Sequence, residues 1–282
     1  EFRRVLFRSK IVVATPPNKQ GKIEPIVLVA ADTCGADLIF KIGGAQAISA
    51  MAIGTKSIPQ VDKIVGPGGS FATTAKYLVS DITAIDMLAG PTELVILVDN
   101  STDPKLAALD IFSQAEHSSD TKCYVITTSY DVAKKISIEI TKLISFIPRK
   151  EIIRTSLQNN GFIAVGNLQA AISLANKIAP EHIQIMMKNP NKIAQKIKSA
   201  GLVLIGPNTP SAASDYLLGT NHILPTNRFG RIRGSLSVID FLKIQTVVHS
   251  SKPTLQKISK HLKTLTDSEN LPNHYSAVRE RL

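Results

Sequence analysis

Gln114 and His117 have the spacing of two metal ligands on one face of a helix. They fall in a helix that we predict over Pro104–Ser119, after a predicted strand over Glu93–Asp99. Residues three apart share a helix face, and imidazole nitrogen and amide oxygen both bind metals, with zinc favouring nitrogen. Taken alone, such a pair is more typical of a solvated helix face. A metal site therefore depends on further ligands elsewhere in the chain.

Glu181 and His182 are candidates for an acid/base pair. They stand at the start of a predicted strand over Ile183–Met187. Histidine is the common general base near neutral pH, and a partly buried glutamate can take a proton from water. Adjacent strand residues face opposite sides of a sheet, so the two side chains need not touch. The alternative interpretation is a surface turn before the strand.

Asp215 and His222 lie in a polar segment after a predicted strand over Val203–Ile205. Ligands of α/β proteins bind at the carboxyl ends of parallel strands, and we expect this segment there. Asp215 is a candidate metal ligand and His222 a candidate substrate contact. A helix cap and a loop hydrogen bond are the alternative roles.

The elements that must position these residues alternate between strands and helices. In the first part, strands are predicted at Ile11–Ala14, Leu38–Ile42, Lys63–Val65 and Leu94–Val98, and helices at Glu24–Ala31, Ala45–Ile53 and Phe71–Val79. In the second part, strands are predicted at Tyr124–Thr127, Phe162–Val165, Ile183–Met187 and Val203–Ile205, and helices at Asp131–Ile144, Leu168–Lys177 and Pro190–Ser199. This alternation predicts an α/β fold with parallel strands, in two lobes that meet near residues 90–92.

The alternation of predicted strands and helices ends after Gly234. Ser235–His249 is predicted to supply an extended return, and Thr254–Leu265 and Glu269–Arg281 to form two short helices. We expect this last stretch to be a small helical appendage at the C-terminus.

Two glycine-rich loops open predicted helices in the first part. Gly43-Gly44 and the stretch of residues 66–69, Gly-Pro-Gly-Gly, each follow a predicted strand. Their backbone N–H groups could meet a phosphate, although neither has the GxGxxG dinucleotide pattern. A tight turn between strand and helix explains either loop equally well.

Composition disfavours two classes of partner. The net charge of +11 could attract nucleic acid, but the lysines are scattered and aromatic residues make up only 5% of the 282 residues, unlike a stacking surface. No apolar run approaches the roughly 20 residues of a membrane span. Two cysteines without a CxxC motif fit a reducing compartment. We therefore expect a cytoplasmic protein with no nucleic-acid and no membrane partner.

Taken together, the motifs resemble the histidinol dehydrogenases, the zinc-dependent, NAD-linked enzymes that end histidine biosynthesis. The resemblance extends from about Lys10 to Leu282. The segments that carry it run in the family's order: Gly43–Ile48, Val61–Gly68, Ala89–Glu93, Gln114–His117, Ala179–His182, Ser214–Tyr216, Gly219–Thr226, and Glu269 with Asn273-His274.

The resemblance implies a role for each matching residue. The implied zinc ligands are Gln114, His117, Asp215 and His274, the last supplied by the partner subunit of a homodimer. The implied acid/base residues are Glu181 and His182. The implied substrate contacts are Thr92, His222 and Glu269, and the cofactor side includes Gln46 and Gly69.

The family resemblance also implies the domain plan. We expect two doubly wound, Rossmann-like lobes, one of them incomplete, with the C-terminal appendage. The implied divisions are a non-native leader over 1–9, a cofactor-side domain over 10–93, a zinc and catalytic domain over 94–236 whose N-terminal portion is missing, and a dimerisation domain over 237–282. The reaction expected is the oxidation of L-histidinol to L-histidine through the aldehyde, with two NAD.

Two departures from the family pattern stand out. The family has an N-terminal region before the strand matched by Lys10–Thr15, and without it we expect exposed apolar surface and poor solubility. The family also usually has asparagine where this chain has Gly69, and a lost side-chain hydrogen bond would weaken NAD binding by about 0.5–1.5 kcal/mol.

Three other functions stay open. A zinc hydrolase using Glu181 and water would turn over without NAD. An inactive fragment that keeps a zinc-dependent dimer interface would associate without turnover. A basic nucleic-acid binder would show salt-sensitive binding to any duplex.

Overall fold

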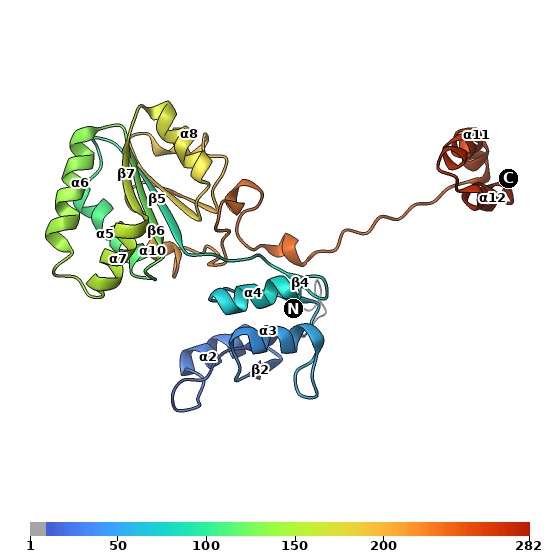
Figure 1. Cartoon of the computed structure of the whole chain (residues 1–282), viewed down its shortest axis with the longest axis horizontal. Helices are drawn as coiled ribbons and strands as arrows, with labels where there is room; N and C mark the ends of the chain where they lie inside the picture. The colour runs from blue at the N-terminus through green and yellow to red at the C-terminus, as the bar shows by residue number, and fades with distance from the viewer. Residues whose placement is uncertain (1–9) are drawn as a thin grey trace. The chain divides into compact units, whose positions relative to one another are not determined.

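The structure is a computed structural model that describes residues 10–282 (Figure 1), so the predicted leader over 1–9 lies outside the described residues. It forms two compact units. The first ends at Asp240 and the second is Phe241–Leu282. Each unit is described by itself below.

A five-stranded parallel sheet forms the centre of the first unit. Its strands are β5 (Glu93–Val98), β6 (Lys122–Thr127), β7 (Gly161–Val165), β8 (His182–Met186) and β9 (Leu202–Ile205). Their order across the sheet is β7-β6-β5-β8-β9, and every pairing is parallel. The chain thus starts in the middle, builds one side and then the other. This is the order of a doubly wound, Rossmann-like sheet, and it confirms the predicted fold class.

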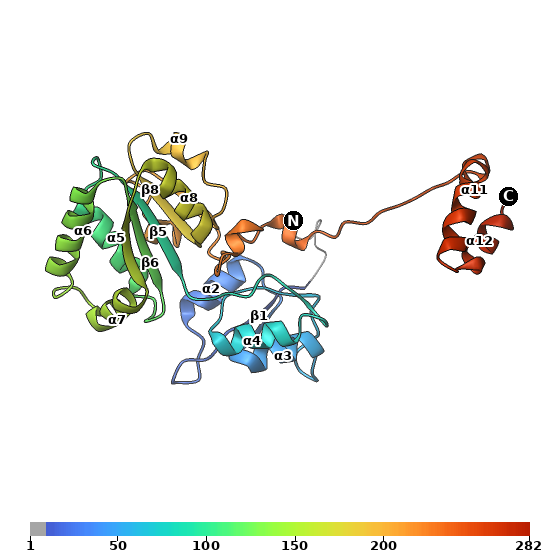
Figure 2. The same cartoon turned by 45° about the horizontal axis from the view of Figure 1, so that its top comes forward.

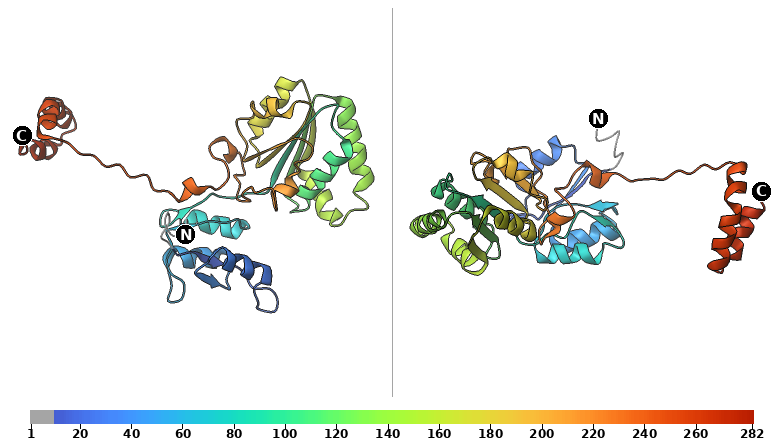
Figure 3. Two further views of the ribbon diagram at one scale, coloured as in Figure 1. Left: turned by 180° about the vertical axis from the view of Figure 1, so that it is seen from behind. Right: turned by 90° about the horizontal axis from the view of Figure 1, so that it is seen from above.

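Helices cover both faces of this sheet (Figures 2 and 3). One face packs against α5 (Pro104–Ala115), α6 (Tyr130–Leu143) and α7 (Lys150–Asn160), and the other against α8 (Leu168–Ile178) and α9 (Pro190–Ala194). Because side chains alternate along a strand, Leu94 and Ile96 of β5 pack toward α5 while Val95 and Leu97 pack toward α8. Burial on both faces explains why β5 reads as a continuous apolar run.

Polar residues begin the main helices as capping rules require. Asp103 accepts a hydrogen bond from the N–H of Lys105 at the start of α5, with Pro104 in the first turn. Ser129 and Asn167 cap α6 and α8 in the same way. These side chains satisfy N–H groups that the helices leave without partners.

The first eighty residues described form smaller sheets. The strands β1 (Val12–Ala14) and β2 (Leu38–Phe40) pair in parallel, as do β3 (Lys63–Ile64) and β4 (Ala84–Ile85). The helices between them are α2 (Pro25–Thr33), α3 (Gly44–Ile53) and α4 (Ser70–Leu78). Large apolar side chains are exposed here, with Ile26 at 78% and Phe71 at 83%.

Two short elements follow β9 in the first unit: α10 (Ser211–Ser214) and the 3-10 turn η1 (Phe229–Arg231). A further 3-10 turn, η2 (Val238–Phe241), falls where we predicted an extended return over Ser235–His249, and no residue of that stretch joins a strand. The predicted extended return therefore forms no strand. The stretch after Phe241 is exposed even at its apolar side chains, with Ile244 at 95% and Val247 at 84%, and its own unit has no strand with which it could pair.

The second unit is a pair of helices, α11 (Lys252–Ser268) and α12 (Pro272–Arg279). Lys263 of α11 lies over the ring of Tyr275 of α12, 5.6 Å from its centroid. Glu269 is the C-cap of α11 and His274 lies in the first turn of α12. This confirms the predicted helical appendage. Of the helices within residues 10–282, none combines the length and the apolarity needed to cross a membrane.

Some element boundaries differ from those predicted. The helix α5 ends at Ala115 rather than Ser119, because the backbone tightens after it: the N–H of His117 bonds the Gln114 carbonyl, three residues back, at 3.1 Å. Helix α9 ends at Ala194 rather than Ser199. The helix α7 and the two-residue strand β4 were not predicted, since α7 is polar and β4 is too short to show a period.

Candidate active site

The polar constellation gathers at the amino ends of the central strands. Glu93 and His182 are the first residues of β5 and β8, and Gln114 lies in the last turn of α5. Helix α5 runs back against the strands, so its C-terminal end reaches their amino edge. Our expectation of a site at the carboxyl ends was wrong for this reason: the segment after β9 docks on the end of α5, where Ser211 accepts a hydrogen bond from Gln114.

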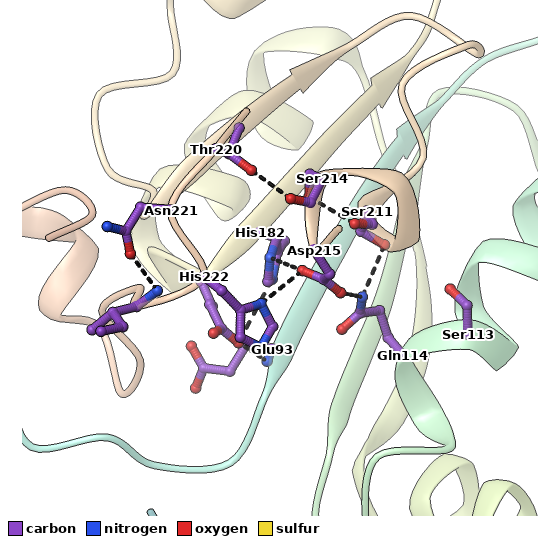
Figure 4. Close-up of polar contacts among 12 residues, drawn as sticks. Glu93, Ser113, Gln114, His182, Ser211, Ser214, Asp215, Thr220, Asn221 and His222 are labelled. Atoms are coloured by element: carbon purple, nitrogen blue, oxygen red, sulfur yellow. Dashed lines mark hydrogen bonds and ion pairs between the residues drawn. The ribbon is translucent and has the colours of Figure 1, made fainter. Parts of the chain in front are cut away.

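His182 stands between two carboxylates, and Figure 4 shows the one of Asp215 beside its ring. Its Nε2 is 3.5 Å from Asp215 Oδ1 and its Nδ1 is 3.6 Å from Glu181 Oε2, while only 1% of the side chain is exposed. Both separations are long for hydrogen bonds, and neither ring nitrogen has a hydrogen-bond partner of good geometry among the described residues. The carboxylates therefore act on the ring chiefly as charges.

The two carboxylates control the pKa of His182. Burial by itself lowers that pKa, because it disfavours the charged ring, but Asp215 and Glu181 outweigh burial and raise the pKa of His182 to about 9. In the metal-free chain the imidazole is therefore protonated at neutral pH.

Glu181 is held in place from the neighbouring strand. Its Oε2 accepts a hydrogen bond of 3.1 Å from the N–H of Glu93. We expected Glu181 and His182 to face opposite sides of the sheet, yet their polar atoms lie close together. The reason is that β8 begins at His182, so Glu181 precedes the strand and does not follow its alternation.

The side chain of Glu93 supports the same corner. Its Oε1 accepts hydrogen bonds from Lys122 Nζ at 2.8 Å and from the N–H of Asn227 at 3.3 Å. The side chain is 4% exposed. This arrangement connects β5, β6 and the loop after His222 at one point.

Gln114 and Asp215 form the second half of the site. The Gln114 Nε2 donates to Ser211 Oγ at 3.1 Å and to Asp215 Oδ2 at 3.4 Å. Both bonds use the amide nitrogen, and they leave Oε1 buried with no partner among the described residues. Burial favours a higher pKa for Asp215, but His182, His222 and the Gln114 hydrogen bond lower it below the usual value.

His222 joins the cluster from the surface. Its Nδ1 is 3.2 Å from Asp215 Oδ1, and 54% of its side chain is exposed (Figure 4). The preceding residues are held by a hydrogen bond of 2.6 Å from Thr220 Oγ1 to the Ser214 carbonyl. A half-exposed imidazole beside a buried carboxylate is suited to contact a small molecule that enters from solvent.

The donors at this edge fit a cation. A buried carbonyl oxygen without a partner, Gln114 Oε1, lies on the same amide that contacts the Asp215 carboxylate. Amide and carboxylate oxygens bind divalent metals, and the C-terminal end of α5 contributes a partial negative charge. Gln114 and Asp215 therefore have the chemistry of two metal ligands.

The structure does not assemble the whole predicted ligand set within one chain. His117 is exposed on the turn after α5, and within residues 10–282 its ring makes no hydrogen bond or ion pair. No group of three or more His, Cys, Asp or Glu side chains in that range is arranged to hold a metal ion. His274 and Glu269 lie in the second unit. The four-ligand zinc set stays a prediction.

The remaining predicted residues lie in the turns that open elements. Gln46 is exposed in the first turn of α3, and Gly69 is the N-cap of α4. Thr92 is half-buried just before β5, where its carbonyl accepts the N–H of Lys122 at 2.9 Å. Their cofactor and substrate roles stay predictions.

Sequence reasoning missed four residues of the site: Glu93 as a buried support, with Lys122, Asn227 and Ser211. One signal was available for Ser211, because it stands four residues before Asp215 and so shares a face with it in a helical turn. The sequence gives no comparable indication for Lys122 and Asn227, because their contacts with Glu93 depend on the order of the strands in the sheet.

Comparison with known proteins places the chain among histidinol dehydrogenases. The family model described as histidinol dehydrogenase matches residues 6–282. Relatives of that name from Methanocaldococcus jannaschii and Caldanaerobacter subterraneus are 44% and 45% identical over 274 residues, covering 97% of this chain. The chain spans 64% of the length of each of these relatives.

A solved structure gives the same result for the fold. The crystal structure of histidinol dehydrogenase from Elizabethkingia anophelis is similar with a TM-score of 0.89 and 35% identity, covering 96% of this chain and 63% of that one. An acetylating aldehyde dehydrogenase from Geobacillus thermoglucosidasius, at 14% identity and a TM-score of 0.52, shares the fold alone.

The His182 ring has a testable titration. In the metal-free chain, its imidazole should titrate near pH 9 by NMR, because two carboxylates favour the charged form. The folded pKa lies above the value of about 6.5 for an unfolded chain. The stability that this ring contributes is therefore complete below about pH 6.5 and is lost as pH rises through about 9.

Asp215→Asn should move the titration of His182 to lower pH, whereas Asp131→Asn, which removes an exposed carboxylate at the start of α6, should leave it in place. An unchanged titration in the Asp215 variant would contradict the geometry described.

Proposed function

The chain belongs to the histidinol dehydrogenase family, and we propose that the protein it forms part of oxidises L-histidinol to L-histidine through the aldehyde, with two NAD and a bound zinc ion. The observation that carries this proposal is the buried His182 between the Glu181 and Asp215 carboxylates, beside an amide oxygen of Gln114 that has no partner. These groups provide a base, a site for water activation and metal ligands within one cluster.

The zinc site would be built from Gln114 and Asp215, with His117 and the partner subunit's equivalent of His274 completing it. When bound, zinc supplies a positive charge that anchors the substrate's nitrogen atoms, and NAD takes up the hydride of each oxidation. In this arrangement the protein is a homodimer whose active site is shared between subunits.

His182 would act as the general base. It takes the proton of the alcohol in the first oxidation and that of the aldehyde hydrate in the second. To do so it must be neutral, whereas the flanking carboxylates raise its pKa to about 9 in the metal-free chain. Asp215, once its charge is shared with a bound cation, would attract the imidazolium less, and the pKa of His182 would fall toward neutral pH.

Glu181 would activate the water that hydrates the aldehyde. Its Oε2 is fixed by the N–H of Glu93, and among the described residues no hydrogen bond is made by Oε1. A carboxylate held at one oxygen and available at the other is oriented to accept a proton from water.

Three side chains would contact the substrate. Thr92 would supply a hydroxyl, His222 an imidazole and Glu269 a carboxylate. Gln46 and Gly69 would contact NAD at the opening turns of α3 and α4. We assign this reaction to the cytoplasm, with no nucleic-acid or membrane partner.

Stoichiometry tests the reaction. We expect zinc-loaded protein to form two NADH per L-histidinol, and chelation to abolish this. The measurement is made on this chain and on a longer form that carries the family's N-terminal region. Turnover without NAD would favour the hydrolase, zinc-dependent association without turnover would favour the interface fragment, and salt-sensitive duplex binding would favour a nucleic-acid binder.

Glu181→Gln separates the two oxidations. Loss of the general base for water should slow oxidation of the aldehyde by about 10²–10⁴-fold, with a smaller effect on oxidation of the alcohol. Glu151→Gln on α7, an exposed carboxylate at 75%, is the control and should leave both steps unchanged. Equal losses in both steps would contradict the role given to Glu181.

Gly69→Asn tests the cofactor side. The backbone of Gly69 has φ −65°, and a side chain built there meets nothing within 4 Å, so asparagine fits without strain. A regained hydrogen bond of about 0.5–1.5 kcal/mol should lower the Kd for NAD by about 2–12-fold. Gly69→Ala adds the Cβ without the amide and should leave the Kd unchanged. If the two variants bind NAD equally, position 69 makes no such contact.

A further inference from the structure

A buried ion pair stands beside the loop that opens α4. Lys76 of α4 is 3% exposed and the side chain of Asp86, just after β4, is fully buried, and Lys76 Nζ contacts Asp86 Oδ1 directly. Burying two charges is costly, and apolar residues of similar size would often stabilise the fold as well or better. A pair of this kind is therefore weak evidence for stability, and its hydrogen bonds indicate another use.

Those hydrogen bonds hold one residue, Gly66, from both sides. Lys76 Nζ donates to the Gly66 carbonyl at 2.8 Å, and the N–H of Gly66 donates to Asp86 Oδ2 at 2.8 Å. The φ of Gly66 is +128°, a conformation that residues with a Cβ rarely adopt. The ion pair thus fixes the orientation of the peptide groups on both sides of an unusual backbone conformation.

The rest of the loop, residues 66–69, is fixed by its own packing. The Thr73 hydroxyl lies 3.3 Å from the Gly68 carbonyl and 3.1 Å from that of Ala89. A Cβ added to Gly68 would lie 2.6 Å from the Cβ of Ala72. The loop ends at Gly69, the N-cap of α4. The loop is thus held at Gly66 by the ion pair and at Gly68 by packing, and the two together set the direction of the first N–H groups of α4.

Asp86 also begins the connection to the candidate active site. Its carbonyl accepts a hydrogen bond from Arg233 Nη1, and four residues later the N–H of Gly90 donates to Thr226 Oγ1 at 2.6 Å. The same stretch then reaches Glu93, whose N–H holds Glu181. One short connector thus runs from the ion pair to the proposed general base for water.

We propose that Lys76 and Asp86 are positioning residues for the dinucleotide, because their ion pair holds the 66–69 loop in the shape that receives NAD. The same pair fixes the start of the connector that leads from Asp86 to Glu93 and so to Glu181. The proposal rests on the proposed function, because it takes the loop that ends at Gly69 as part of the cofactor site. It assigns to the pair no contact with substrate and no part in proton transfer.

The test compares two ligands in a variant that keeps the volume of the pair and removes both charges, Lys76→Met/Asp86→Leu. In the full-length protein its Kd for NAD should rise at least 10-fold, whereas its Kd for L-histidinol in the presence of zinc should stay within 2-fold of the parent value. A purely structural role would change the melting temperature and leave the ratio of the two Kd values unaltered.

The matched control removes an exposed ion pair instead. Glu151→Leu/Arg154→Met takes away an i,i+3 pair on α7 and should change neither Kd. If the Lys76/Asp86 double variant does not melt cooperatively, Lys76→Met/Asp86→Asn replaces it, because asparagine keeps an acceptor for the N–H of Gly66 and no buried charge is left unpaired. The same rise in the NAD Kd is expected.

Failure of the proposal is distinguishable from failure of the proposed function. If the parent protein binds NAD and oxidises histidinol while the folded variants bind NAD with an unchanged Kd, the positioning role is wrong. If the parent protein does not bind NAD at all, both the proposed function and the positioning role are wrong.

Discussion

The hydrogen bond from Gln114 to Ser211 is the interaction on which the candidate active site depends. It joins the C-terminal end of α5 to the first residue of α10, and Asp215 follows one helical turn later. Because the amide nitrogen is used by Ser211 and Asp215, the amide oxygen is left buried and without a partner among the described residues. Such an oxygen costs free energy unless a ligand completes it. The fold therefore maintains an unsatisfied acceptor beside a carboxylate, which is the condition for binding a cation.

The position of this site at the amino edge of the sheet follows from the same interaction. Parallel sheets usually place ligands at the carboxyl edge, where loops leave the strands. Here α5 carries Gln114 back to the amino edge, and the segment after β9 is drawn there by Ser211. His182 and Glu93 then supply side-chain and backbone groups from the first positions of β8 and β5. The buried sheet makes these positions rigid, and the half-exposed His222 leaves access from solvent.

The sequence was sufficient for the fold class and for much of the site, for identifiable reasons. The alternation of strand-like and helix-like runs predicts an α/β fold with parallel strands, and the family resemblance implies that the sheet is doubly wound. The motif order predicts Gln114, Glu181, His182, Asp215 and His222, which the structure brings together. What failed depends on three-dimensional order. Lys122 contacts Glu93 because β6 lies beside β5. Glu181 approaches His182 because β8 begins at His182, so that Glu181 precedes the strand and does not follow its alternation. Neither fact has a local sequence signal. Likewise, α5 ends in a tight turn in which the N–H of His117 bonds the Gln114 carbonyl, and this leaves His117 outside the helix.

The measurement that tests the central claim most directly is the X-ray absorption spectrum at the zinc edge of the zinc-loaded full-length protein, with zinc affinity measured in parallel. The account predicts nitrogen and oxygen ligands only, at about 2.0–2.2 Å, and a zinc affinity that falls at least 10-fold in Gln114→Leu but not in Ser113→Ala, one residue earlier on α5. A sulfur ligand, or an unchanged affinity after loss of the Gln114 amide, would contradict the conclusion that this amide is held open for a metal.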